Sequence, residues 1–140
     1  MSNDEERINN LVAESRLLEG AFNELTARQN FLERILIESR TSVETIKGLG
    51  SANSEEVLIP IGAGVLLRSS PPKTDKMLVN IGANVVVEKG REEATKIMEG
   101  RAEQLEQNLM SLLSQRNQIA QRLDAERRAL QTLLNKQQGQ

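Results

Sequence analysis

A repeat in the middle of the chain limits the possible folds more than any other part of the sequence. Residues 57–68 (VLIPIGAGVLLR) align without a gap on residues 77–88 (MLVNIGANVVVE), twenty positions later. Each copy is an apolar run rich in β-branched residues, and small residues interrupt it at its centre. Two short strands joined by a turn have this pattern. The sequence therefore predicts one β-hairpin in each copy.

The two predicted turns read GAG at 62–64 and GAN at 82–84. Gly and Asn best tolerate a left-handed backbone, so we expect a three-residue loop with its last position left-handed. A two-residue turn led by the first glycine fits nearly as well. A glycine loop binds phosphate at the start of a helix, whereas strand residues follow both of these turns. The turn glycines Gly62, Gly64 and Gly82 are therefore expected to shape the chain rather than to bind a cofactor.

Apolar residues fall on both faces of the predicted strands, and two isolated hairpins of this length are not stable in water. If half of their apolar side chains stayed exposed, the lost burial would be on the order of 14 kcal/mol. That value rivals the whole stability of a typical domain. We therefore expect the hairpins to pair with strands of other chains. The strand residues expected in this assembly are Val57, Ile59, Val65, Leu67, Met77, Val79, Ile81, Val85, Val86 and Val87.

A long helix is predicted before the hairpins, because residues 4–47 contain no proline and only one glycine, Gly20. Alternating steps of three and four residues, the spacing of a coiled-coil seam, run along it. They select Ile8, Leu11, Ser15, Leu18, Phe22, Leu25, Gln29, Leu32, Leu36, Ser39, Val43 and Ile46. The small and polar residues Gly48, Gly50, Ser51, Asn53 and Ser54 are expected to end this helix and form a flexible joint.

A second long helix is predicted from Arg91 to Lys136, with acidic residues in its first turn. The same stepping selects Met98, Ala102, Leu105, Leu109, Leu112, Arg116, Ile119, Leu123, Glu126, Leu130 and Leu133. An antiparallel pair is the arrangement that buries both seams within one chain. Pro71-Pro72 predicts a crossing loop between the hairpins. The expected fold is α+β and mostly α, with coiled-coil helices at 1–47 and 91–140 around an oligomerisation region at 48–90.

Polar seam residues suggest a register for the two helices. One alignment places Ser15 opposite Glu126 and Ser39 opposite Ala102, whereas a shift of one heptad loses the polar match. We hypothesise that such residues fix the register at some cost in stability. The alternative is that Arg116 and Glu126 only extend their charged ends to solvent.

Composition excludes several classes of function. The chain has no Cys, no His and no phosphate-binding GxxxxGK[ST] loop, so catalysis would be left to carboxylates, Lys and Ser. A formal charge of -2 and a pI near 5.4 argue against a nucleic-acid partner. No apolar run approaches a membrane span, and the polar start MSNDEER is not a signal peptide. We expect a cytoplasmic protein that is not an enzyme and that needs no cofactor or metal.

VLIPIGAGVLLR and TDKMLVNIGANVVVEKGREEA, between two heptad helices, resemble an alpha-class subunit of archaeal-type prefoldin over the whole chain. The specific part is the pair of IGA turns and the VEKG run that ends at Gly90. The resemblance implies a hexamer of two alpha and four beta-class subunits, whose hairpins build a double β-barrel carrying six coiled coils. It also implies capture of unfolded client proteins without ATP and their transfer to a group II chaperonin.

The free ends of the coil are the expected client-binding surface. Apolar residues persist there instead of thinning to polar ones, and a frayed end has neighbours on one side only. The candidate client-binding residues are Ile8, Leu11, Val12, Leu130, Leu133 and Leu134. A different interpretation is that they only continue the seam and close the coil. At the level of function, the alternative to a chaperone is a structural coiled-coil adaptor that binds one defined folded partner.

Overall fold

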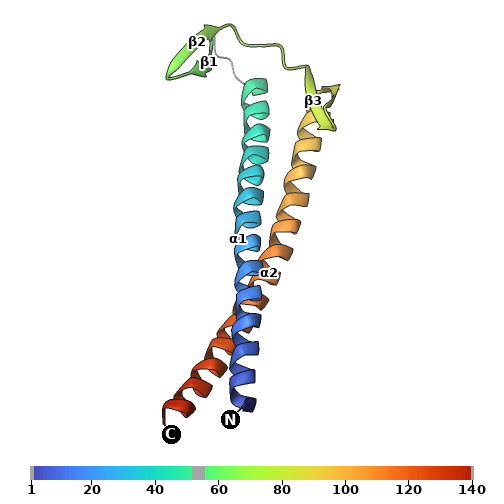
Figure 1. Ribbon diagram of the computed structural model, residues 1–140. Helices are drawn as coiled ribbons and strands as arrows, with labels where there is room; N and C mark the ends of the chain where they lie inside the picture. The colour runs from blue at the N-terminus through green and yellow to red at the C-terminus, as the bar shows by residue number, and fades with distance from the viewer. Residues whose placement is uncertain (1, 52–55, 140) are drawn as a thin grey trace. The chain divides into compact units, whose positions relative to one another are not determined.

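The computed structural model of the protein describes residues 2–51 and 56–139. The elements follow the order α1 (Ser2–Ser51), β1 (Val57–Gly62), β2 (Val65–Ser69), β3 (Lys76–Gly82), β4 (Val85–Gly90) and α2 (Arg91–Gln138) (Figure 1). Two long helices therefore flank two antiparallel hairpins, as the sequence predicts. The chain divides into two compact units: Met1–Arg34 with Leu105–Gln140, and Ile35–Gln104.

The first unit is an antiparallel pair of helical segments, and both chain ends lie at the same end of it (Figure 1). The predicted seam is confirmed in both helices, because every position selected by the three-and-four stepping is buried or half-buried. Leu112 and Leu123 are the most enclosed of these positions in this unit. The cause is the spacing itself, which returns a side chain to the same helix face every 3.5 residues on average.

The predicted end of the first helix is wrong. α1 does not end at Lys47 but continues through Gly48 and Gly50 to Ser51. Glycine in a helix interior costs only about 1 kcal/mol relative to alanine. Leu49 of this last turn lines an apolar groove with Val79 and Met98, and this packing can offset that cost. The rest of the predicted joint, Asn53 and Ser54, lies outside the described residues.

The second unit contains both hairpins. β1 pairs with β2 and β3 pairs with β4, and the two sheets share the same register irregularity one residue before Gly62 and Gly82. α2 begins at Arg91, directly after β4, as predicted, and ends at Gln138, two residues beyond the predicted Lys136. Residues 70–75, which contain both adjacent prolines, form no strand, in agreement with the predicted crossing loop.

The loops of the hairpins differ from both predicted turns. Each strand pair closes at a glycine, so the loop has two residues, Ala63-Gly64 or Ala83-Asn84. Position 64 or 84 is left-handed, as expected, with φ of 80° and 61°. The preceding alanines are left-handed as well, with φ of 51° and 50°. Two consecutive left-handed residues match the twist of antiparallel strands, and the extra residue before each closing glycine is accommodated as a β-bulge.

Candidate interaction surfaces

Polar contacts across the coil establish the pairing of the two helices in the first unit. The Ser15 hydroxyl donates a hydrogen bond to the Glu126 carboxylate at 3.1 Å. The Arg116 guanidinium donates to the Thr26 hydroxyl at 3.1 Å and lies over the Phe22 ring, 4.6 Å from its centroid. The predicted match of Ser15 with Glu126 is therefore confirmed. Both seam charges have partners on the facing helix, so the alternative that they only reach for solvent is wrong.

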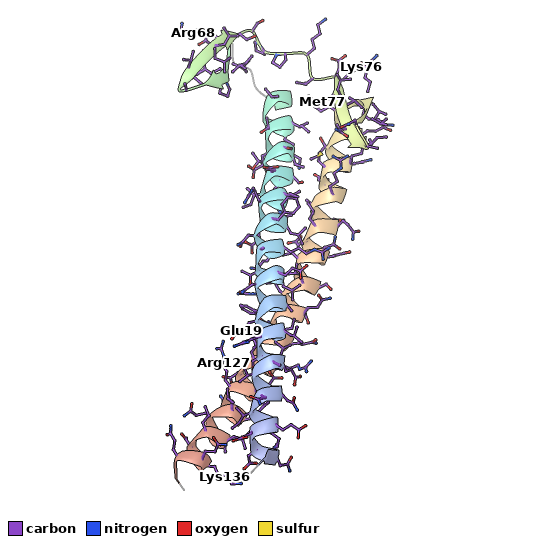
Figure 2. All side chains as sticks on the ribbon, in the orientation of Figure 1. Glu19, Arg68, Lys76, Met77, Arg127 and Lys136 are labelled. Carbon is purple, nitrogen blue, oxygen red and sulfur yellow. The ribbon has the colours of Figure 1, made fainter. Side chains whose placement is uncertain are left out.

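Ion pairs accompany the seam on both of its sides. Glu14 pairs with Arg122 at 2.7 Å on one side, and Glu19 pairs with Arg127 at 3.3 Å on the other. Figure 2 shows Glu19 and Arg127 extending toward each other from facing helices. Their side chains are at least half exposed, and such pairs contribute little to stability. Their main effect is to keep the flanks of the seam polar.

The apolar residues at the free end of the coil fall into two groups. Ile8, Leu11 and Leu130 are half-buried and Leu133 is buried, as expected for a continued seam. Val12 and Leu134 belong to a different row. They lie one heptad closer to the chain ends than Glu19 and Arg127, on the same faces of the two helices. At Glu19 and Arg127 these positions form an ion pair.

The second group leaves apolar surface exposed. Leu134 is 38% exposed and Val12 is half-buried. An ion pair between Lys136 and Asp4, at 3.8 Å, lies still closer to the chain ends (Figure 2). Charged flanks therefore bracket a short apolar break at the end of the coil. We call Val12 and Leu134 the tip pair.

The hairpins form a second candidate surface. All ten predicted assembly residues lie in strands. In the first hairpin most of them are exposed, for example Ile59 at 43% and Leu67 at 53%. In the second hairpin Val79 is an exception, since only 8% of it is exposed. The two copies of the repeat therefore differ in their surroundings.

Contacts with the helix ends explain the burial of Val79. This residue lines a groove of about 650 Å³ together with Ile46 and Leu49 of α1 and Met98 of α2. Ala94, in the first turn of α2, lines the same groove and is 1% exposed. The hairpin of β3 and β4 is thus packed on the helices of its own unit.

Two arginines of α2 contact this hairpin and the loop that leads into it. Arg101 donates a hydrogen bond to the main-chain carbonyl of Asn80, and Arg91 donates to the Thr74 hydroxyl at 3.2 Å. Asn80 also accepts a bond from the Gly82 amide at 2.9 Å through its side chain, which supports the bulge before the turn. These contacts hold the end of β3 next to its turn and the loop that precedes its start.

The sequence-based selection missed several exposed apolar residues on the helices. These are Leu17, Phe31, Ile37 and Met110, which are between 56% and 76% exposed. None falls on the seam spacing, and a search for apolar residues outside the seam would have found them. Single exposed apolar residues are common on proteins, so these four residues do not by themselves indicate a binding site.

Other kinds of site find little support in the described residues. Within 2–51 and 56–139, no three acidic side chains gather in a way that could hold a metal ion. The glycines of the turns have positive φ and nothing near their missing side chains, as expected for a purely conformational role. In the same part of the chain, no helix combines the length and apolar character needed to cross a membrane.

Comparison with known proteins agrees with this arrangement. A family model described as Prefoldin subunit matches residues 18–136. The prefoldin subunit alpha of Nitrosopumilus maritimus is 29% identical over 120 residues, which cover 86% of this chain and 83% of the relative. That of Archaeoglobus fulgidus is 32% identical over 129 residues, which cover 86% of this chain and 94% of the relative.

A solved structure gives the same fold. Filamentous PFD from Methanocaldococcus jannaschii aligns with a TM-score of 0.66 at 24% identity and covers 79% of this chain and 92% of that chain. At this identity the likeness concerns the fold alone.

Proposed function

The chain belongs to the prefoldin family, a family of chaperones, and on that basis we propose that it is an alpha-class subunit of an ATP-independent holdase. Prefoldin alpha subunits assemble with beta subunits into oligomers. In the proposed function, non-native polypeptides bind at the coil tips and pass to a group II chaperonin. Holding and transferring clients in this way requires no catalysis, and the proposed localisation of the protein is the cytoplasm.

The observation that carries this proposal is the tip pair. One heptad before the free end the facing residues of this row are charged, Glu19 with Arg127, whereas the tip positions Val12 and Leu134 are apolar. Exposed apolar surface is the property that unfolded chains share, so a small apolar site at the free end of the coil can bind many clients. Several tips in one oligomer raise the effective concentration and turn weak contacts into useful affinity.

Reconstitution tests the proposal. The chain is mixed with a beta-class prefoldin subunit, the mass of the complex is measured, and suppression of aggregation is recorded for several unrelated denatured proteins. A holdase suppresses aggregation of all of them, does not bind their native forms and needs no nucleotide. Binding of one folded protein alone, with no effect on denatured clients, would instead support a coiled-coil adaptor.

Assembly through the hairpins has its own test. Val86 is 54% exposed on a strand, whereas Val79 is buried inside the chain's own unit. Val86→Asp therefore places a charge on a surface that only a partner would bury, at a penalty of several kcal/mol in the complex. We expect loss of the oligomer in sedimentation with retained helical circular dichroism. An intact oligomer would count against assembly through this strand.

A further inference from the structure

The groove between the second hairpin and the helix ends has the size and lining of a small-molecule site. It has a volume of about 650 Å³, and apolar side chains of β3, α1 and α2 line it. Met77, which Figure 2 labels, contributes to it from the start of β3. Pockets of about 300–1,000 Å³ with mostly apolar walls and a few polar groups are typical of sites for small ligands.

The charge of this groove is positive. Among the described residues that line it, Arg101 of α2 carries a charge and no side chain is acidic. A cation at the edge of an apolar groove favours a ligand that has one negative charge and an apolar body.

Hydrogen-bond donors at the same place remain available to such a ligand. The Arg101 guanidinium donates to the Asn80 main-chain carbonyl and to the Met98 sulfur at 3.6 Å, and an arginine has five N–H donors. The Asn80 side chain accepts from the Gly82 amide at 2.9 Å through its oxygen. Its amide nitrogen has no partner within the described residues. A carboxylate can accept from both side chains at once.

The other polar residues of the groove are already satisfied as donors. The Ser42 and Thr45 hydroxyls both donate to main-chain carbonyls of α1, each at 2.9 Å. The donors left for a ligand are therefore those of Arg101 and Asn80, at the side of the groove where α2 meets β3.

We propose that this groove binds a free single-chain carboxylate of the fatty-acid class. The carboxylate accepts hydrogen bonds from Arg101 and Asn80, and the alkyl tail lies along Ile46, Leu49 and Val79. Charge complementarity selects this occupant, because a ligand with a second charge would bring that charge against apolar walls. The proposal goes beyond the proposed chaperone function, in which the groove has no role.

Isothermal titration calorimetry on the full-length chain tests the site with decanoate below its micelle concentration. One decanoate should bind per chain. Octanoate, which is two methylenes shorter, should bind about tenfold more weakly, since each buried methylene contributes about fourfold in affinity. Decanol, which has the same tail and no charge, should also bind about tenfold more weakly.

Arg101→Gln separates the role of this arginine toward the ligand from its role in holding the hairpin. The variant should lose the preference for decanoate and bind decanol within about twofold of the wild type. A purely structural effect would weaken both ligands equally. Arg7→Gln, which makes the same charge change at an exposed position outside the groove, should leave both affinities unchanged.

A second variant blocks the groove without changing the charge. Thr45 lines the groove at an exposed helix position, so Thr45→Phe should abolish saturable binding of both ligands. The matched control is Thr132→Phe, at an exposed threonine of α2 whose hydroxyl donates to the same kind of main-chain carbonyl, and it should bind normally. Helical circular dichroism is recorded for each variant.

Three results on the chain alone would overturn the proposal: equal affinity of the wild type for decanoate and decanol, equal losses for both in Arg101→Gln, or full binding by Thr45→Phe. The complex with a beta-class subunit should still bind one decanoate per copy of this chain. Loss of binding on assembly would show that a partner covers the groove, and the proposal would fall. Suppression of client aggregation by the same complex tests the proposed function separately.

Discussion

Single residues in the hairpin loops carry conformational strain that can be relieved. Ala63 is left-handed with φ of 51° and precedes Gly64 in a two-residue loop. A left-handed residue with a Cβ atom costs about 1–2 kcal/mol, and Asn-Gly is a preferred pair for such a loop. Ala63→Asn should therefore raise the free energy of unfolding by about 0.5–1 kcal/mol, whereas Ala63→Val should lower it. Thermal unfolding at fixed protein concentration measures both. Shifts of the same sign would contradict the loop geometry.

A second residue-scale effect lies in the seam. The side-chain amide of Gln29 donates to the Glu33 carboxylate at 3.0 Å, but its oxygen Oε1 is buried and has no hydrogen-bond partner in the described part of the chain. A buried polar atom without a partner costs about 1–3 kcal/mol. Gln29→Leu should raise the free energy of unfolding by about 1–2 kcal/mol in urea titrations followed by circular dichroism.

The matched control for Gln29 is Gln118→Leu, at an exposed position of α2. Surface changes of this kind stay within about 0.5 kcal/mol. Equal effects of the two substitutions would show that the unpartnered oxygen does not limit stability.

At the scale of whole elements, periodicity determined most of what could be predicted. The seam spacing is a property of the helix itself, so it identified the buried positions without knowledge of the partner. Ser15 and Glu126 could also be matched, because few polar residues interrupt an otherwise apolar seam.

Boundaries and loops were predicted less well for a physical reason. The glycines at 48 and 50 are weak helix formers, but α1 continues past them, and Leu49 between them lines an apolar groove with residues of β3 and α2. The loop length depends on the bulge before Gly62, which follows from strand pairing rather than from local preference. Tertiary interactions of this kind leave no local pattern in the sequence.

The register of the coil can be tested with introduced cysteines, since the chain has none of its own. With Ser15 facing Glu126, Leu11→Cys and Leu130→Cys should form a disulfide. The pair Leu11→Cys and Leu123→Cys, displaced by one heptad, should remain reduced. Replacing both polar residues with leucine should make the displaced pair reactive, because the penalty for slipping is then removed. Mass spectrometry after oxidation distinguishes the two pairs. Unchanged selectivity would mean that the polar contact does not fix the register.

At the scale of the whole molecule, the sequence identified apolar residues at the coil ends, but it did not show which of them are buried in the seam and which are exposed. Leu133 is 9% exposed and therefore closes the seam, whereas Leu134, its neighbour, is 38% exposed. This distinction depends on which residues face each other across two helices. For the same reason, the sequence analysis did not select Leu17 and Phe31. They are exposed because no partner helix lies over them within the described chain.

The tip pair allows a client-binding test that leaves the coil intact. Val12→Glu combined with Leu134→Arg copies the pair formed by Glu19 and Arg127 one heptad away, so the coil should be as stable as before or slightly more stable. Leu133 and the rest of the seam are untouched. In oligomers assembled with a beta-class subunit, suppression of client aggregation should fall, and equivalent changes in the beta tips should lower it further, because several tips act together.

A control variant away from the tip shows whether clients bind at the tip or along the whole coil. Leu17→Arg removes an apolar side chain that is 76% exposed away from the tip. If the ends of the coil hold the client, this variant should retain normal capture, since the apolar surface at the tips is unchanged. If Leu17→Arg weakens capture as much as the double tip variant, clients bind along the whole coil. Full capture after all alpha and beta tips have been made polar would show that the tip pair does not bind clients. Helical circular dichroism and particle mass, measured on each variant, ensure that a loss of capture is not a loss of assembly.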